Sequence, residues 1–404
     1  MWLAALQKAT ATDDYTVEMK FKRPTPVSNW MAITAAGSQN EIENPEAVKQ
    51  YGPVISDWEN AIGTGPFMLT DYVAESSMTL SRNPDYWGYD ERHPENQLPY
   101  VDELRILVIP DIATARAALR TGKIDMLGVS WDQAMNLSET NPELLQGTLP
   151  AFGMGLVMRC DKEPFTDINV RKALQMAIDR KTIAETYYGG VVDGKPSGLM
   201  RSGIEGWTTA YDEWPQELKD EYSYNPERAK QLLAEAGYPQ GFKTNIVAGL
   251  GDTDLLQIIQ AYFKDINVDM EIMTMDLGAF FGYLRAGKHD QMYYWFEGGL
   301  GFAPTISIYW RASKGATSNF AYNNDAGYDA LVQKFVTATD EEEARRIFAE
   351  ASWYTLEHHW AVQIFPLASY NVWQPYLKGY SGETVEFRYL AYYAARLWID
   401  QDLK

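Results

Sequence analysis

Along most of the chain, segments in which apolar residues alternate with polar ones or form short continuous runs are followed by segments in which apolar residues recur three and four positions apart. Alternating or continuous apolar runs predict strands at residues 14–21, 103–109, 242–248, 267–275, 291–296 and 361–366. Apolar residues three and four apart predict helices at residues 254–265, 276–287 and 340–358, and two shorter helical pieces within 167–188. Strands and helices that succeed one another in this way indicate α/β layers.

Residues that begin and end helices support these assignments. Asp111 is placed as an N-cap and Gly122 as the residue just beyond the end of a short helix. Asn225, followed by proline and glutamate, predicts another helix start, and Gly237 predicts its end. Residues 189–215 lack both periods and are rich in glycine, proline and tryptophan, which predicts a long excursion on the surface.

Composition narrows the class of protein but does not name a ligand. A chain of 404 residues with 46% hydrophobic and 22% charged residues fits two or three globular domains. Its net charge of −20 argues against nucleic acid and against anionic membrane surfaces, because both need a basic face. No apolar run approaches the length of a membrane span.

The single cysteine and the first residues say little about the cellular compartment. Cys160 lies in a strand-like run, where a lone cysteine is expected to be a small core residue, and no intramolecular disulfide can form. The first 17 residues have neither a basic segment nor a continuous apolar core, so they do not form a signal peptide. Taken literally, the sequence describes a soluble cytosolic protein.

Catalytic and cofactor motifs are incomplete. Four Gly-x-Gly sequences lack the rest of a dinucleotide fingerprint, and no phosphate-binding loop or nucleophile elbow occurs. Of the histidines His93, His289, His358 and His359, the last two are about 100° apart on a helix and cannot face one metal ion. We therefore expect that the protein has no cofactor or bound metal and is not an enzyme. The sequence leaves open whether two of the 55 acidic residues form the carboxylate pair of a glycosidase.

Aromatic residues gather where a predicted strand runs into a glycine-rich loop, at residues 293–311. Flat rings beside a loop suit sugar stacking or pockets for peptide side chains, but the same pattern fits an ordinary strand end. The candidate ligand contacts are Tyr294, Trp295, Phe296, Glu297, Trp310 and Arg311, with Trp131 and Trp207 as weaker candidates. Arg311 is suited to bind a carboxylate through two parallel hydrogen bonds.

Four sequence blocks, in order, resemble one known family. They are GTGP with two strands and NPDYW at 63–87, the unit at 99–127, PFTDINVRKALQMAIDRK from 164, and 319–367 with its long helix and IFPL. Together they resemble the family-5 extracellular solute-binding proteins of ABC importers, which carry peptides, nickel or oligosaccharides.

The resemblance implies an α/β fold of the two-lobed periplasmic-binding-protein type, type II, in its three-domain variant. On this pattern residues 63–152 and 366–404 form the first lobe, 153–365 the second lobe, and 1–62 a remnant of the small domain. The family normally has a signal peptide, earlier strands and most of the small domain before this point. We therefore expect an N-terminally truncated form, whether as a shortened reading frame, an engineered fragment or a natural short form.

The implied function is capture of a small polar ligand between the lobes, an oligopeptide first, with oligosaccharide or nickel as alternatives. Peptide binders usually place an aspartate in the loop that here reads EGGLGFAP, where only Glu297 is acidic. Either Glu297 neutralises the peptide amine from a shifted position or the ligand has no free amine. The implied partners are permease subunits, with no nucleic acid, and the implied state is an extracytoplasmic monomer. A carbohydrate-active hydrolase and a poorly folding fragment remain competing hypotheses.

Overall fold

The structure is a computed structural model of the whole chain. It describes residues 6–22, 44–52, 57–200, 205–249, 253–298, 304–309, 311–313, 319–382 and 393–404. Two compact units divide the chain. The first unit consists of Met1–Gly37 and Ala151–Leu367, and the second unit consists of Ser38–Pro150 and Ala368–Lys404.

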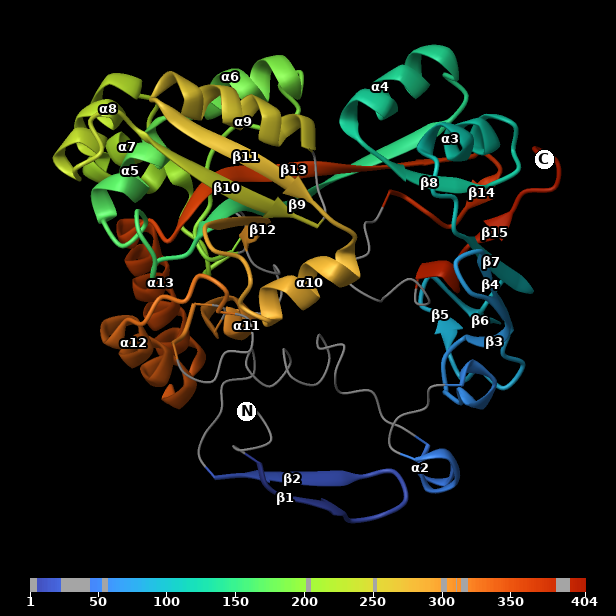
Figure 1. The fold of residues 1–404 in the computed structure, drawn as a ribbon. Helices are drawn as coiled ribbons and strands as arrows, with labels where there is room; N and C mark the ends of the chain where they lie inside the picture. The colour runs from blue at the N-terminus through green and yellow to red at the C-terminus, as the bar shows by residue number, and fades with distance from the viewer. Residues whose placement is uncertain are drawn as a thin grey trace. The chain divides into compact units, whose positions relative to one another are not determined.

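In the first unit strands and helices alternate from β10 (Phe242–Ala248) to β12 (Met292–Gly298), as the periodicity predicts, and runs of helices precede and follow this segment (Figure 1). This unit also contains the strands β1 (Leu6–Ala11), β2 (Val17–Phe21) and β11 (Val268–Thr274). Its helices are α5 (Ile168–Met176), α6 (Arg180–Thr182), η3 (Ile183–Tyr187), η4 (Tyr211–Glu213), α7 (Gln216–Tyr222), α8 (Pro226–Glu235), α9 (Thr253–Asp265), α10 (Leu277–Arg285), α11 (Pro304–Tyr309), α12 (Ala326–Thr337) and α13 (Glu341–His358).

Two long strands, β9 (Leu145–Met158) and β13 (Ala361–Trp373), carry the chain from one unit into the other. The strand order in the large sheet is β11-β10-β12-β9-β13-β8. β10 is parallel to both β11 and β12, whereas β12 is antiparallel to β9. The first unit thus has a mixed sheet in which three neighbouring strands end at the same edge.

Strand alternation gives this sheet two apolar faces. On one face Val157, Val247 and Tyr293 pack against Phe280 and Leu284 of α10. A separate cluster joins α12 and α13 through Tyr328, Leu331, Phe335, Ile347 and Phe348. Both faces of the strands are buried, which is typical of α/β proteins and explains the nearly continuous apolar runs in the sequence.

The second unit is built from small antiparallel sheets and short helices. Its elements are α2 (Pro45–Tyr51), η2 (Trp58–Asn60), β3 (Phe67–Val73), β4 (Ser77–Arg82), β5 (Tyr89–Asp90), β6 (His93–Gln97), β7 (Glu103–Leu107), α3 (Ile112–Arg120), β8 (Met126–Val129), α4 (Trp131–Thr140), β14 (Leu377–Lys378) and β15 (Trp398–Ile399). β3, β4 and β7 form a three-stranded sheet, and β8 pairs with the last four residues of β13. Leu119 of α3 and Leu137 of α4 are buried with Tyr370 and Val372 of β13.

The predicted helix ends are confirmed. The side chain of Asp111 accepts a hydrogen bond from Thr114 N at 2.8 Å, and that of Asn225 accepts one from Arg228 N at 3.0 Å. Gly122 and Gly237 both have positive φ, as residues that follow a helix often do.

The predicted surface excursion at 189–215 is wrong for several of its residues. Leu199, Met200, Trp207 and Trp214 are buried, because they pack on α12, α13 and α7. Large apolar side chains on a segment without periodicity still bury their surface, and periodicity reports only regular backbone.

Candidate functional site

The carboxyl edge of the parallel strands is where the candidate residues of β12 lie. In open α/β sheets ligands bind beyond the carboxyl ends of parallel strands. The last pair between β10 and β12 is Ala248 with Tyr294, so Trp295 to Gly298 extend beyond β10. On its other side this extension still pairs with β9, Trp295 opposite Gly155 and Phe296 opposite Met154.

Glu297 and Arg311, two of the candidate residues, form a buried ion pair. Arg311 Nη2 contacts Glu297 Oε1, and the side chains are only 5% and 7% exposed, respectively. Removing one member of a buried pair leaves the other charge without compensation, which costs about 3–5 kcal/mol. In this arrangement each charge neutralises the other, so the two groups act together and not as separate anchors.

Gly155 makes room for this pair. A Cβ atom added at Gly155 would overlap Glu297 Cγ and would lie 3.0 Å from Glu297 Cβ and 3.1 Å from Val362 O. A glycine within a strand often marks a close approach of this kind. In the sequence Gly155 stands out only as part of an incomplete Gly-x-Gly motif. A glycine within a predicted strand is the one sequence signal that could have indicated this close approach.

Further contacts fix Arg311 in place. Arg311 hydrogen-bonds with the Tyr293 side chain, and burial raises the pKa of Tyr293. Asn323 Nδ2 donates to the carbonyl oxygen of Arg311 at 2.7 Å, and Ser313 N donates to Asp329 Oδ1 at 2.8 Å. These bonds tie the turn at residues 311–313 to the start of α12. Sequence reasoning did not single out Asn323, since asparagine at a turn is common.

Strand alternation separates the candidates of β12 into two sets. Tyr293 and Trp295 belong to the cluster on α10, and successive side chains of a strand point to opposite faces, so Tyr294 faces the other way. Near the end of the strand the Phe296 ring instead lies 4.6 Å from the Trp295 ring, so these two rings are neighbours. Trp295 is half-buried, with its ring 5.5 Å from Phe280 and 4.9 Å from Phe281. Tyr294 is fully buried, whereas Phe296 is half-buried.

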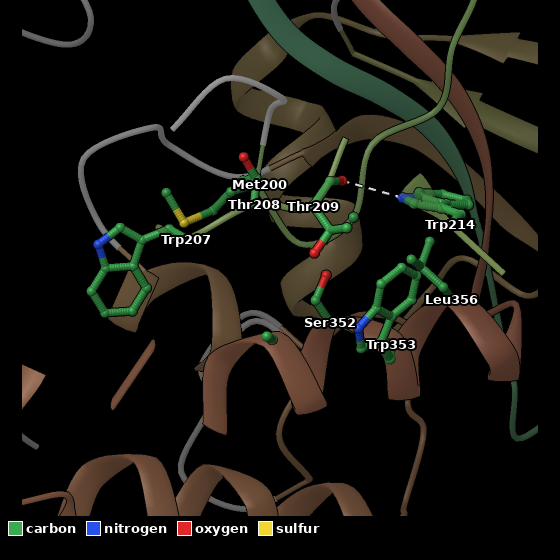
Figure 2. A pocket seen from close by; sticks show the side chains of 10 residues that line it. Met200, Trp207, Thr208, Thr209, Trp214, Ser352, Trp353 and Leu356 are labelled. Atoms are coloured by element: carbon green, nitrogen blue, oxygen red, sulfur yellow. Dashed lines mark hydrogen bonds between the residues drawn. The ribbon is translucent and has the colours of Figure 1, made fainter. Parts of the chain in front are cut away.

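Of the remaining candidates, the structure describes Trp207 and Trp131, and Trp310 lies outside the described residues. Trp207 is buried, and its ring centre lies 5.5 Å from that of Phe348. Trp207 also lines a pocket, which Figure 2 shows. Trp131 is the first residue of α4 in the second unit and is half-buried against its core.

The pocket beside Trp207 is small. Trp214 and Trp353 also line it, and Trp214 Nε1 donates to Thr209 O at 3.2 Å (Figure 2). Its cavity volume of about 10 Å³ is enough for roughly one water molecule. A solute of several atoms does not fit there.

Cys160 and two histidines, side chains of the kinds that catalyse reactions or bind metals, lie in the packed interior, Cys160 only in part. Burial raises the pKa of Cys160 to about 11, so its thiol stays protonated at neutral pH. His289 and His359 are fully buried, and burial lowers the pKa of each. Among the residues that the structure describes, no three His, Cys, Asp or Glu side chains converge on a metal site. Within the same described residues, no helix has the length and apolar character needed to cross a membrane.

Comparison with known proteins now identifies the family. The model of the bacterial extracellular solute-binding proteins, family 5, matches residues 2–319. The chain belongs to this family. Proteins with similar sequences include heme-binding protein A from Haemophilus influenzae, 26% identical over 338 residues, which are 79% of this chain and 57% of that protein. The dipeptide-binding protein from Pseudomonas aeruginosa is 25% identical over 369 residues, 88% of this chain and 63% of the relative.

Solved family-5 structures share the fold. The periplasmic binding protein DppA from Helicobacter pylori, in complex with the peptide STSA, aligns with a TM-score of 0.79 at 21% identity, covering 98% of this chain and 75% of the other. The oligopeptide-binding protein AppA from Bacillus subtilis, with a nonapeptide, aligns with a TM-score of 0.76 at 20% identity, covering 99% and 79%. The predicted fold class is therefore confirmed. The chain spans 57% and 63% of the lengths of the two curated relatives above.

Proposed function

We propose that this protein is the solute-binding component of an ABC importer and that it captures a short peptide or a peptide-like solute. The observation that carries the proposal is the family match over residues 2–319. Relatives named for dipeptides and for oligopeptides support a peptide as the first ligand to test. The implied partners are permease subunits, and the implied location is outside the cytoplasm.

The ligand contacts that we propose lie at the carboxyl edge of β12. Trp295 and Phe296 extend beyond β10 and keep part of their rings exposed, which suits contact with a ligand. Glu297 and Arg311 supply one charge of each sign in the same place. A peptide amine that binds Glu297 would have to replace Arg311 as its partner, and a ligand carboxylate would have to replace Glu297. Tyr294 and Trp310 are further proposed contacts and Trp131 is a weaker one, whereas Trp207, packed against Phe348, is the weakest of the set.

Two alternatives within the family differ in ligand chemistry. An oligosaccharide would stack on the same aromatic rings without using either charge. Nickel held directly by protein would need several histidine, cysteine or carboxylate ligands, and no group of three converges in the part of the chain that the structure describes. A carbohydrate-active hydrolase, the alternative from another class, differs by turnover of its substrate.

A binding screen tests the proposal. The protein is titrated calorimetrically with a library of di- to nonapeptides, with oligosaccharides and with Ni²⁺, and product formation is followed. We expect stoichiometric binding of a peptide without product. Binding of none of these ligands would overturn the function, and product formation would favour the hydrolase.

Tryptophan variants test the site separately. Trp295→Ala and Trp310→Ala are compared with Trp87→Ala, whose side chain is 74% exposed in the second unit. We expect Trp295→Ala to weaken the bound peptide at least about tenfold, a loss of roughly 1.4 kcal/mol, and Trp87→Ala to leave its affinity unchanged. If Trp295→Ala and Trp310→Ala both keep the affinity of the unaltered protein, the proposed contacts are wrong even though the function stands.

A further inference from the structure

Arg180, at the start of α6, is a buried guanidinium whose hydrogen bonds within the described residues all go to backbone carbonyls. The residue is 4% exposed. Its Nε donates to Gln363 O at 2.6 Å, and its Nη1 donates to Gln175 O at 3.1 Å, Ile178 O at 3.3 Å and Tyr222 O at 3.1 Å. None of these partners carries a negative charge.

Helix ends compensate the positive charge of Arg180. Gln175 lies in the last turn of α5, and Tyr222 is the last residue of α7. The carbonyl groups at the C-terminal end of a helix carry partial negative charge and stabilise a cation there. Burial lowers the pKa of Arg180 to about 10, which still leaves the guanidinium charged at neutral pH. The site therefore needs no anion to balance this charge.

Within the part of the chain that the structure describes, three buried polar atoms around Arg180 have no hydrogen-bond partner: Arg180 Nη2, Gln175 Nε2 and Gln363 Oε1. The three residues are neighbours, because the backbone of Gln363 hydrogen-bonds with the side chains of both Gln175 and Arg180. Gln363 N donates to Gln175 Oε1 at 3.1 Å, and Gln363 O accepts from Arg180 Nε. Each buried polar atom without a partner costs about 1–3 kcal/mol, so a cluster of three calls for a bound molecule.

We propose that one ordered water molecule is bound inside the first unit between Arg180 Nη2, Gln175 Nε2 and Gln363 Oε1. Water accepts two hydrogen bonds, here from Nη2 and Nε2, and donates one to Gln363 Oε1, so a single molecule satisfies all three atoms. A chloride ion would face the Gln363 oxygen and the four carbonyl oxygens around the guanidinium, and its charge would be repelled.

Among the described residues no strand pairs with β13 at Gln363 on the side of Arg180, and the bound water completes the network that takes the place of such a strand. In the first unit β13 has β9 as its strand neighbour, while β8 pairs with β13 only at residues 370–373. At Gln363 the side chains of Gln175 and Arg180 take the backbone hydrogen bonds that a strand would otherwise take. The water holds these two side chains and Gln363 in one network, which fixes β13 before it continues into the second unit.

Crystallography at about 1.5 Å of the unaltered protein is the direct test. We expect density for one water within roughly 2.7–3.2 Å of the three named atoms. A dry site, or a direct bond between Arg180 Nη2 and Gln363 Oε1, would overturn the proposal. Crystals soaked in sodium bromide provide the other arm, since an anomalous bromide peak at this position would show an anion site instead of a water site.

A solution measurement checks the same water independently. Magnetic relaxation dispersion of oxygen-labelled water counts internal waters with long residence times. Gln363→Met removes the acceptor, and Gln333→Met, on the exposed side of α12, is the matched control. We expect Gln363→Met to lose one long-lived water and Gln333→Met to lose none. An equal count in Gln363→Met and the unaltered protein would contradict the proposal.

Discussion

Replacing Gly155 by alanine tests whether this glycine is what allows Glu297 to pair with Arg311. The φ of Gly155 lies outside the left-handed range, so alanine introduces no backbone strain of that kind. The added methyl group would overlap Glu297 Cγ and lie 3.1 Å from Val362 O. Because the backbone at Val362 belongs to the sheet, the Glu297 side chain is the part that must move, and it leaves Arg311 without its carboxylate.

The expected loss follows from the burial of the pair. Both side chains are almost fully buried, so separating them costs about 3–5 kcal/mol, the range found when a buried pair loses one partner. This is a large part of the roughly 5–15 kcal/mol that stabilises a typical protein. A change of that size lowers the melting temperature by roughly 6–20 °C. Calorimetry and urea unfolding followed by tryptophan fluorescence measure it.

Two comparisons isolate the cause. Gly282→Ala, in α10 with no atom within 4 Å of the added Cβ, is the matched control and should be neutral or slightly stabilising. In a Glu297→Ala background the side chain that alanine would strike is absent, so Gly155→Ala should then cost less than about 1 kcal/mol. Equal costs of Gly155→Ala in the two backgrounds would refute the reasoning.

Three further predictions concern other parts of the first unit. Burial lowers the pKa of His359 below its ordinary 6.5, so the unfolded chain gains a proton that the folded chain does not. Stability should therefore fall as the pH drops below about 6.5, by up to about 1.4 kcal/mol per pH unit, and His359→Asn should flatten this slope in melts at pH 5–8. An unchanged slope would show that His359 is protonated in the folded state. Asp340→Ala removes the N-cap of α13 and should cost about 1 kcal/mol in urea unfolding, whereas no loss would mean that other groups satisfy Glu343 N. Trp207→Ala should cost about 3–5 kcal/mol through lost contacts with Phe348 but leave ligand affinity unchanged, and a large affinity loss with little destabilisation would instead support Trp207 as a ligand contact.

Elements with strong local signals agree with their sequence patterns. β10 has the predicted bounds, and α13 starts one residue after its predicted start, because Asp340 is its N-cap and accepts a hydrogen bond from Glu343 N at 2.8 Å. The sequence does not predict β1, since LQKATA has no clear alternation and only one large apolar residue, Leu6. Its pairing with β2 decides its conformation, and pairing is not a local property.

The candidate site shows the same division. The aromatic run before the glycine-rich loop points to the end of β12, but it does not show that Trp295 packs on α10 while Tyr294 faces the other way. That assignment needs the register, in which Trp295 pairs with Gly155. The sequence indicates Arg311 as an anchor for a ligand carboxylate, whereas in the structure Arg311 has Glu297 as a buried partner.

The sequence by itself determined the α/β class, most helix ends and the family, because caps, periodicity and ordered motifs are properties of neighbouring residues. Only the tertiary structure decided which residues without local signals matter, such as Gly155 beneath Glu297 and Gln363 beside Arg180. Those contacts join residues more than 140 positions apart in the chain. Burial makes their charges and unpaired polar atoms energetically important, and burial exists only once the chain has folded.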